Sequence, residues 1–339
     1  MKSFKVAVVG ATGMVGQKML EVLAERKFPI SELLPFASAK SAGKKLSYGG
    51  KDYTIIETNA ENIAKYPADI VIMSAGGGAS KEFSPLFAAA GGVVIDNSAA
   101  WRMNENVPLV VPEVNPADAL NRPLGIIANP NCSTIQAMVA LSPLNKAFGI
   151  KRIIYTTFQA VSGAGVKGYA DLDEGIAALA NGQPVPSPKK FAHQIAANCV
   201  PEIDVLLDNG YYKEEQKMID ETHKILHDDS INVTATCVRV PVYYSHSESI
   251  NVEFKTAAEL DEVKAVLKNA EGLIVMDDAA NHVYPTPLYA TDKDEVFVGR
   301  IRKDFSVENG VNMWVVADNI RKGAATNAVQ IAQLIASKL

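Results

Sequence analysis

One cysteine stands where a thiol could act as a nucleophile. Cys132 lies in the segment Asn-Pro-Asn-Cys-Ser-Thr-Ile-Gln (129–136), which follows a predicted strand and opens an apolar helix. The positive end of the helix dipole stabilises a thiolate there. A thiolate can attack an aldehyde to form a thiohemiacetal, and loss of hydride to NADP would then give a thioester. Cys199 and Cys237 lack this context, and we expect them to be small buried apolar residues.

A histidine could supply the acid and base for this chemistry. His246 lies between two predicted strands, in the segment Arg-Val-Pro-Val-Tyr-Tyr-Ser-His (239–246). A loop imidazole with an ordinary pKa of about 6.5 can exchange a proton near neutral pH. His223 and His227 stand four residues apart on a predicted helix, which is half of a metal-binding pattern, but no third ligand accompanies them. We therefore expect these two at the surface and no metal site.

Three glycines could cradle a dinucleotide. The segment Val-Ala-Val-Val-Gly-Ala-Thr-Gly-Met-Val-Gly (6–16) runs from the first predicted strand into the first helix. Glycines in such a turn let the backbone approach a pyrophosphate, which then sits at the helix N-terminus. The spacing is GxxGxxG rather than the commoner GxGxxG, so a plain tight turn remains the alternative.

The end of the second predicted strand discriminates between the two nicotinamide cofactors. A NAD site usually has an acidic side chain there, which binds the ribose 2′-hydroxyl. Here the strand is followed by Ser38-Ala-Lys40-Ser41-Ala-Gly-Lys. Hydroxyls and a cation suit a 2′-phosphate, which favours NADP. The alternative is a solvated basic loop.

Two kinds of fold must position these residues. Short apolar runs alternate with helical patterns in the first third, which is typical of a parallel sheet covered on both faces. Longer β-rich runs after residue 131 predict an α+β domain with a mixed or antiparallel sheet. We therefore expect an α/β protein with a Rossmann-like NADP-binding domain at 1–130, completed by a C-terminal helix at 318–339, and a catalytic and dimerisation domain at 131–317. The strands predicted for the first domain are Phe4–Val9, Leu33–Ala37, Ile70–Ser74, Val93–Asp96, Leu109–Val111 and Ile126–Ala128, and those for the second are Arg152–Ala160, Asn232–Tyr243, Ser249–Lys255 and Glu295–Asp304.

The composition excludes several classes of protein. The 339 residues include 33 Lys or Arg and 38 Asp or Glu, for a net charge of −5, which leaves no basic footprint for nucleic acid. The chain has three cysteines and no CxxC motif, which excludes a framework of disulfide bonds. The uncharged stretch 123–145 contains too many polar residues for a membrane span. We expect a cytoplasmic protein without a membrane or nucleic-acid partner.

Several motifs occur in an order that resembles the aspartate-β-semialdehyde dehydrogenase family. The resemblance covers essentially the whole chain, and the motifs are specific as a set. They are Gly-Ala-Thr-Gly-Met-Val-Gly (10–16), Ser-Ala-Ala-Trp-Arg (98–102), Asn-Pro-Asn-Cys-Ser-Thr-Ile-Gln (129–136), Phe-Gln-Ala-Val-Ser-Gly-Ala-Gly (158–165), Glu-Glu-Gln-Lys-Met (214–218), Arg-Val-Pro-Val (239–242), Ser-His (245–246) and Trp-Val-Val-Ala-Asp-Asn-Ile-Arg-Lys-Gly-Ala-Ala (314–325). The family often has Phe where this chain has Trp101, which is a conservative aromatic change.

The resemblance implies a role for each matching position. Cys132 would be the nucleophile, His246 the acid and base, and Gln159 the residue that orients the substrate. Arg239 would hold the substrate α-carboxylate and Glu214 would face its α-ammonium group, while Arg102, Asn131 and Lys217 would bind phosphate. The residues that would line the NADP site are Gly10, Thr12, Gly13, Met14, Val15, Gly16, Ser38, Lys40, Ser41, Ser162, Gly163 and Asn319.

The implied reaction is the reductive dephosphorylation of L-aspartyl 4-phosphate to L-aspartate 4-semialdehyde by a homodimer. The family context is the biosynthesis of lysine, methionine, threonine and diaminopimelate. A related alternative is an N-acetyl-glutamyl-phosphate reductase, whose acetylated substrate needs no carboxylate such as Glu214. A regulator that senses NADP without catalysis is an alternative from another class, and it would need neither Cys132 nor His246.

Overall fold

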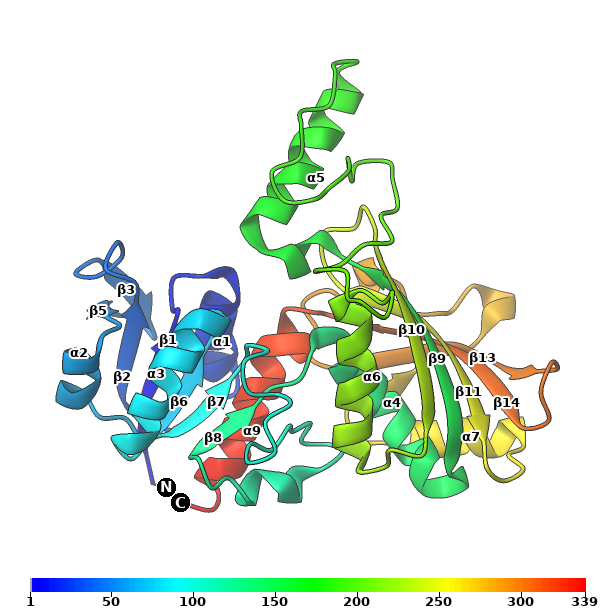
Figure 1. Ribbon diagram of the computed structural model, residues 1–339, viewed down its shortest axis with the longest axis horizontal. Coiled ribbons are helices and arrows are strands. Elements are labelled where there is room, and N and C mark those ends of the chain that lie inside the picture. The colour runs from blue at the N-terminus through cyan, green and yellow to red at the C-terminus, as the bar shows by residue number, and fades with distance from the viewer. Residues whose placement is uncertain (1) are drawn as a thin grey trace. The chain divides into compact units, whose positions relative to one another are not determined.

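The computed structural model describes residues 2–339, which form two compact units (Figure 1). The first unit takes the chain up to Asn131 and again from Ala324 to Leu339, and the second comprises Cys132–Gly323. The sequence predicted that the C-terminal segment of the first domain begins at residue 318, whereas in the structure it begins at Ala324. The side chain of Asn319 bonds Ser162 and the Ser245 amide, which ties this stretch to the second unit. No helix within residues 2–339 combines the length and apolar character needed to cross a membrane.

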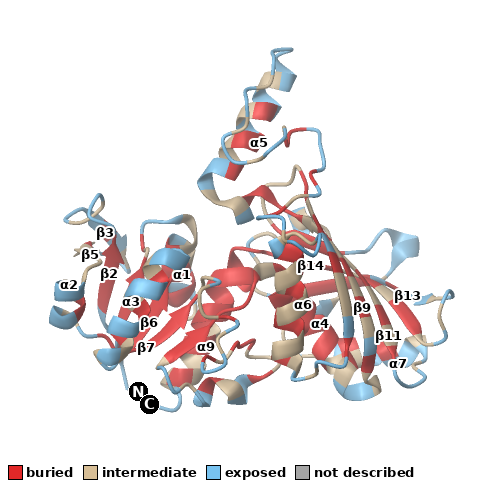
Figure 2. Ribbon diagram, in the orientation of Figure 1, coloured by how far each residue is buried: buried red, intermediate tan, exposed pale blue. Residues whose placement is uncertain are grey.

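The first unit is built on a parallel six-stranded sheet of order β5-β2-β1-β6-β7-β8. Its central strands are buried, apart from Lys5 near the start of β1, because helices cover both faces. The last helix, α9, packs against α1 in the same apolar core, which Figure 2 shows as buried strands between helices. The strands are β1 (Phe4–Val9), β2 (Ile30–Ala37), β5 (Ile56–Glu57), β6 (Ile70–Met73), β7 (Val93–Asp96) and β8 (Ile126–Ala128), with a hairpin of β3 (Lys45–Tyr48) and β4 (Lys51–Thr54). The helices are α1 (Met14–Glu25), α2 (Ala60–Lys65), α3 (Gly77–Ala89) and α9 (Thr326–Ala336).

One predicted strand of this unit is wrong. Of the residues in Leu109–Val111, Leu109 makes an isolated bridge to Ala128, but no strand forms. The side chain of Asn115 accepts a hydrogen bond from the Val111 amide and donates one to the Leu109 carbonyl. A side chain thus satisfies backbone groups that a strand would have used.

The second unit contains a mixed six-stranded sheet of order β10-β9-β11-β14-β13-β12. β10 and β12 pair in parallel with their neighbours, and the three central pairings are antiparallel. The predicted combination of a parallel α/β domain with an α+β domain is therefore confirmed. The strands are β9 (Ile150–Gln159), β10 (Asn232–Arg239), β11 (His246–Phe254), β12 (Leu273–Val275), β13 (Val296–Asp304) and β14 (Gly310–Ala317).

Helices cover one face of this sheet. α4 (Cys132–Phe148), α6 (Lys213–Leu226) and α7 (Leu260–Lys268) pack on it, while the short α8 (Pro287–Ala290) contacts β14. Side chains of β9, β11 and β14 alternate between buried and half-buried, because one face meets the helices and the other is open (Figure 2). α5 (Gly165–Ala180) stands out from the sheet in Figure 1, and a small apolar core of its own lies beside it.

Candidate active site

Three of the predicted site residues lie side by side at one end of the second sheet. Gln159 ends β9 and Arg239 ends β10, and the two are directly paired. His246 begins β11, where it follows the Ser247–Phe158 pair and therefore falls beside Gln159. The row Arg239–Gln159–His246 thus crosses three strands on the face that the helices cover. All three side chains are buried, so their contacts are held by the sheet rather than by a loop.

The imidazole of His246 is fully buried and its two nitrogens have different surroundings. Nδ1 accepts a hydrogen bond from the main-chain N–H of Ala160 at 3.0 Å, and Nε2 lies 3.5 Å from the amide nitrogen of Gln159. Burial and the neighbouring Arg239 cation lower the pKa of His246 to about 3, although Glu214 opposes the shift. The ordinary loop histidine expected from the sequence is wrong on both counts, because the residue begins a strand and its pKa is low.

Gln159 and Glu214 are joined beside this ring. The carbonyl oxygen of the Gln159 side chain accepts from the Thr157 hydroxyl at 3.1 Å, and its amide nitrogen donates to Glu214 at 3.1 Å. Glu214 lies in the first turn of α6 and is buried. The two hydrogen bonds fix the orientation of the Gln159 amide.

Lys217 lies one turn after Glu214 and is held by two carboxylates. Its ammonium group is 3.0 Å from Glu214 and 2.8 Å from Asp204. Burial lowers the pKa of Lys217, but the two carboxylates more than offset this effect and the pKa is raised. The cation is therefore kept charged, and it balances the buried Glu214.

Cys132 is the first residue of α4, as the sequence predicted, and it is half-buried. Its thiol interacts electrostatically with the guanidinium of Arg239. Gly323 packs against it so closely that a Cβ there would lie 2.8 Å from the Cβ of Cys132. The expectation for the other cysteines is half right, since Cys237 is buried whereas Cys199 is exposed.

The predicted glycine turn lies in the first unit and has the tight backbone that the motif requires. Gly10 has a φ of +83°, and a Cβ on it would lie 2.3 Å from the Ser74 carbonyl oxygen. A Cβ on Gly16 would lie 2.1 Å from the carbonyl oxygen of Gly10. Thr12 and Gly13 are exposed, and α1 begins at Met14, followed by the half-buried Val15, without a side-chain cap. This leaves backbone N–H groups open at a helix N-terminus, where an anion binds well.

The end of β2 lies beside this turn. The amides of Gly10 and Ala11 both donate to the carbonyl of Phe36. The turn that follows β2 carries Ser38 and Lys40, both exposed, and the half-buried Ser41. These positions therefore stand next to the glycine turn, as a site for the cofactor ribose requires.

The remaining predicted residues divide between the two units. In the first, the guanidinium of Arg102 donates to the carbonyls of Asn129 and Asn97, and Asn131 is buried. In the second, Ser162 and Asn319 hydrogen-bond each other. A Cβ on Gly163 would lie 3.1 Å from Nη1 of Arg239 and 3.3 Å from Nε2 of His246. Gly163 therefore leaves room directly in front of these two side chains.

Comparisons with known proteins give the family. A semialdehyde dehydrogenase NAD-binding domain model matches residues 5–122, and a semialdehyde dehydrogenase dimerisation domain model matches residues 141–322. The aspartate-semialdehyde dehydrogenase of Aquifex aeolicus is 57% identical over 98% of both chains. The chain belongs to the aspartate-semialdehyde dehydrogenase family. It is therefore an enzyme, an oxidoreductase with a nicotinamide cofactor and a small-molecule substrate.

Solved structures agree with this assignment. The crystal structure of aspartate semialdehyde dehydrogenase II from Vibrio cholerae complexed with ASA matches with a TM-score of 0.94, at 48% identity over 99% of both chains. The Candida albicans aspartate semialdehyde dehydrogenase with NADP matches with a TM-score of 0.77, at 28% identity over 99% of both chains. The family resemblance of the sequence motifs is thus confirmed, and it extends over the whole fold.

Sequence reasoning missed several residues that hold the site of this enzyme. Ala160 acts through its backbone, Thr157 acts on Gln159 two residues along the same strand, and Asp204 and Gly323 contact residues from other segments of the chain. Two of these residues lie in motifs quoted above, Ala160 in 158–165 and Gly323 in 314–325, but neither motif indicates the contact that the residue makes. No pattern in the sequence marks a backbone amide as the partner of His246.

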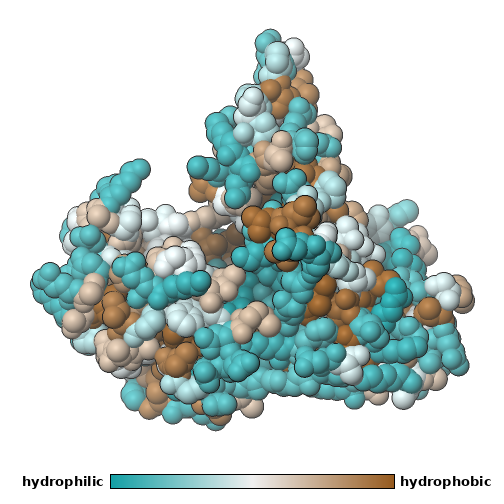
Figure 3. Space-filling view, viewed as in Figure 1, coloured by the Kyte–Doolittle hydropathy of each residue, from teal (hydrophilic) through white to brown (hydrophobic). Residues whose placement is uncertain are grey.

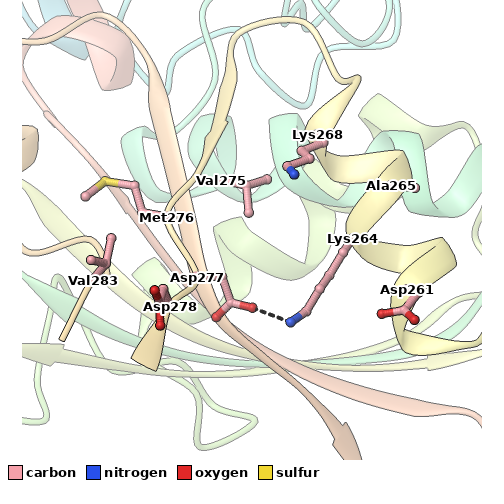
Figure 4. Close-up of a pocket in the computed structure, with 9 residues that line it drawn as sticks. All are labelled: Asp261, Lys264, Ala265, Lys268, Val275, Met276, Asp277, Asp278 and Val283. Carbon is pink, nitrogen blue, oxygen red and sulfur yellow. Dashed lines mark ion pairs between the residues drawn. The ribbon is translucent and has the colours of Figure 1, made fainter. Parts of the chain in front are cut away.

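A separate pocket of about 560 Å³ lies at the opposite edge of the second sheet, between α7 and β12 (Figure 4). Lys264 and Asp277 form an ion pair of 2.8 Å across it. None of the predicted site residues lines it. Within residues 2–339, no cluster of three or more His, Cys, Asp or Glu side chains could hold a metal ion.

Proposed function

We propose that this enzyme converts L-aspartyl 4-phosphate to L-aspartate 4-semialdehyde, reversibly and with NADPH, through a thioester on Cys132. The observation that carries the proposal is the buried row Arg239–Gln159–His246 with Glu214 beside it and the Cys132 thiol in the field of Arg239. This arrangement places a cation, an anion and a nucleophile around one small space. An amino acid with a reactive carbonyl is a ligand that needs all three.

Two residues of this site would bind the amino-acid end of the substrate. The guanidinium of Arg239 would bind the α-carboxylate, for which its planar pair of donors is suited. The buried carboxylate of Glu214 would face the α-ammonium group. An acetylated substrate nitrogen carries no charge, so it would add no cation to the one that Glu214 already has in Lys217, which favours the aspartyl substrate over an N-acetyl-glutamyl one.

Cys132 would attack the acyl carbon, and the bond from that carbon to the phosphate oxygen would break. Arg102 and Asn131 would bind the departing phosphate, with Lys217 as a further cation. The Nε2–H of the neutral His246 ring would donate a hydrogen bond to the oxyanion of the tetrahedral adduct and stabilise its charge until the adduct collapses and Cys132 leaves as a thiolate. A free thiolate fits a reducing, cytoplasmic setting.

The glycine turn suits the dinucleotide, because the backbone at Gly10 and Gly16 is too tight for a side chain and the N-terminus of α1 is open. The turn at Ser38, Lys40 and Ser41 contains no carboxylate, which supports NADP rather than NAD. Ser162, Gly163 and Asn319 would complete the site. Bound NADPH supplies the hydride for reduction of the acyl group.

We expect the enzyme to act as a homodimer through the open face of the second sheet. Phe158 and Trp314 lie on that face with their rings 5.4 Å apart. The projecting α5 adds the exposed apolar residues Val166, Ile176 and Leu179, and Figure 3 shows brown, apolar areas on this projection. An apolar surface of this kind is typical of an interface. The family model for this region is a dimerisation domain. The enzyme would serve amino-acid biosynthesis, toward lysine, methionine, threonine and diaminopimelate.

Replacement of the proposed nucleophile tests the reaction. Cys132→Ala should abolish phosphate-dependent reduction of NADP with aspartate semialdehyde, while NADP binding measured by calorimetry stays within about twofold of wild type. Cys199→Ala is the matched control, because Cys199 is an exposed thiol, and it should keep full activity. Turnover in Cys132→Ala would refute the mechanism. Equal rates with N-acetyl-glutamate semialdehyde would refute the substrate.

A further inference from the structure

The guanidinium of Arg239 is covered on one side by an aromatic ring. Its central carbon lies 5.9 Å from the centroid of the Phe191 ring. Nη1 donates to the main-chain carbonyl of Ala160 at 2.6 Å, which fixes one edge of the group. A cation over an aromatic face is attracted by the ring and is restricted in its rotation. Arg239 is 5% exposed, so this contact is made away from water.

One N–H donor of Arg239 is unused by the described residues, which indicates a ligand-binding site. Nε is buried and has no hydrogen-bond partner within residues 2–339. Buried donors are nearly always satisfied, and a carboxylate commonly accepts from Arg through two parallel hydrogen bonds. Burial also lowers the pKa of Arg239, which an anionic ligand would counteract. The unused edge of the guanidinium is therefore suited to a carboxylate.

A carboxylate on α5 holds the loop that carries Phe191. The oxygens of Asp171, which is buried, accept hydrogen bonds from the amides of Lys189 and Lys190 at 2.8 Å each and from that of Phe191 at 3.3 Å. Three successive N–H groups on one carboxylate define the position of the loop. The ring also approaches α5 at Gly168, where a Cβ would lie 3.0 Å from it.

The same loop returns to the backbone of Arg239. The amide of Val200 donates to the carbonyl of Arg239 at 2.9 Å, and the amide of Arg239 donates to that of Val200 at 2.8 Å. Phe191 and Val200 also share a small core. The loop 189–200 therefore fixes Arg239 at two points, with its main chain at one and its side chain at the other.

We propose that Phe191 is a positioning residue for substrate binding, which orients the Arg239 guanidinium toward the α-carboxylate, and that Asp171 sets the loop in place. The inference rests on the proposed role of Arg239. The ring excludes water from one face of the cation, and this strengthens the bond that the other edge makes with an anion. It follows that the loop after α5 contributes to the choice of substrate through the Phe191 ring, which acts on Arg239.

Variants of Phe191 give a pattern that a purely structural role would not. Phe191→Ala should raise KM for aspartate semialdehyde about fivefold to tenfold, with KM for phosphate and for NADP unchanged within twofold. Phe191→Tyr keeps the aromatic face and should restore the wild-type KM. Phe191→Leu keeps the apolar packing without that face and should remain impaired. Asp171→Asn should raise the same KM. A general rise in all three KM values, or full function in Phe191→Leu, would overturn the inference.

A double-mutant cycle separates this inference from the proposed function. Arg239→Lys should raise KM for aspartate semialdehyde strongly, because an ammonium group cannot replace a planar fork. Adding Phe191→Ala to Arg239→Lys should then have little further effect. The same fivefold to tenfold rise in both backgrounds would overturn the positioning role alone. A normal KM in Arg239→Lys would instead refute the proposed role of Arg239. Thermal unfolding midpoints within about 3 °C of wild type would show that each variant is folded.

Discussion

The main-chain N–H of Ala160 donates a hydrogen bond to Nδ1 of His246 over 3.0 Å. A neutral imidazole carries one proton, so a ring that accepts at Nδ1 carries its proton on Nε2. The nearest side-chain partner of Nε2 is the Gln159 amide nitrogen, which already donates to Glu214. A Cβ on Gly163 would lie 3.3 Å from Nε2, so a substrate oxygen in the space in front of Gly163 would accept from this N–H.

The first prediction is that His246 stays neutral throughout the working pH range. Its pKa of about 3 means that a plot of log kcat/KM against pH has no inflection from this residue between pH 5 and 8. Nitrogen-15 NMR of histidine-labelled enzyme should show the proton on Nε2, with the exposed His193 as a reference signal in the same spectrum. A proton on Nδ1, or a titration of His246 near pH 6.5, would contradict the prediction.

The same low pKa has a consequence for stability. The folded pKa lies below the unfolded value of about 6.5, so the neutral ring contributes stability above pH 6.5 that is lost as the pH falls toward 3. The free energy of unfolding of wild type should therefore fall faster than that of His246→Gln between pH 6.5 and 4. Urea titrations at several pH values measure the difference. Parallel pH dependence of the two proteins would count against the buried neutral ring.

Glu248 leads to a second prediction, on the same strand. It is fully buried between Thr157 and Val315, and neither carboxylate oxygen has a hydrogen-bond partner within residues 2–339. Burial raises the pKa of Glu248 well above its ordinary value, so its contribution to stability is complete below about pH 4.5 and is lost as the pH rises through the folded pKa. Glu248→Gln should raise the thermal unfolding midpoint at pH 8 by about 2–5 °C, and this gain should shrink at pH 4.5.

Glu32 provides the control for this substitution. It lies on β2 of the first unit and pairs with Lys5 at 3.1 Å, and both side chains are about half exposed. Glu32→Gln should change the midpoint by less than about 1 °C, because an exposed ion pair contributes little. A Glu248→Gln enzyme less stable than wild type at pH 8 would mean that the native carboxylate is satisfied.

The fold could be predicted from the sequence, and candidate site residues could be proposed from it, because both rest on local patterns. Short apolar runs that alternate with helical segments predicted the parallel sheet. The bounds of the strands Phe4–Val9 and Val93–Asp96 were predicted to the residue. The motif around Cys132 gave the start of a helix. Ordered motifs supplied the rest of the candidate set.

What the sequence could not give are relationships between segments far apart in the chain. The environment of His246 comes from the Ala160 amide and the Arg239 cation, which reach it only through strand pairing. The failed strand at Leu109–Val111 depends on one side chain, Asn115, whose bonds no periodicity reveals. Contacts of this kind are decided by register and burial.

A third prediction concerns Gly323, which has no room for a side chain. A methyl group there would lie 2.8 Å from the Cβ and 3.3 Å from the Cα of Cys132. Gly323→Ala should displace the thiol and lower kcat by about 10- to 100-fold, with KM for NADP unchanged. Gly78→Ala is the control, because a Cβ at that position of α3 meets nothing within 4 Å. Normal kcat in Gly323→Ala would show that the contact does not position the nucleophile.

The fourth prediction tests the preference for NADP at the end of β2. Lys40 is exposed in the turn that follows this strand, beside the glycine turn that Phe36 ties to it. If its ammonium group binds the 2′-phosphate, Lys40→Ala should raise KM for NADP about fivefold to tenfold and leave KM for NAD unchanged, because NAD lacks that phosphate. Lys51→Ala, an exposed lysine on β4, should affect neither cofactor. An equal loss with NADP and NAD would mean that Lys40 acts on the dinucleotide in general, and the assignment of NADP would then lose its main support.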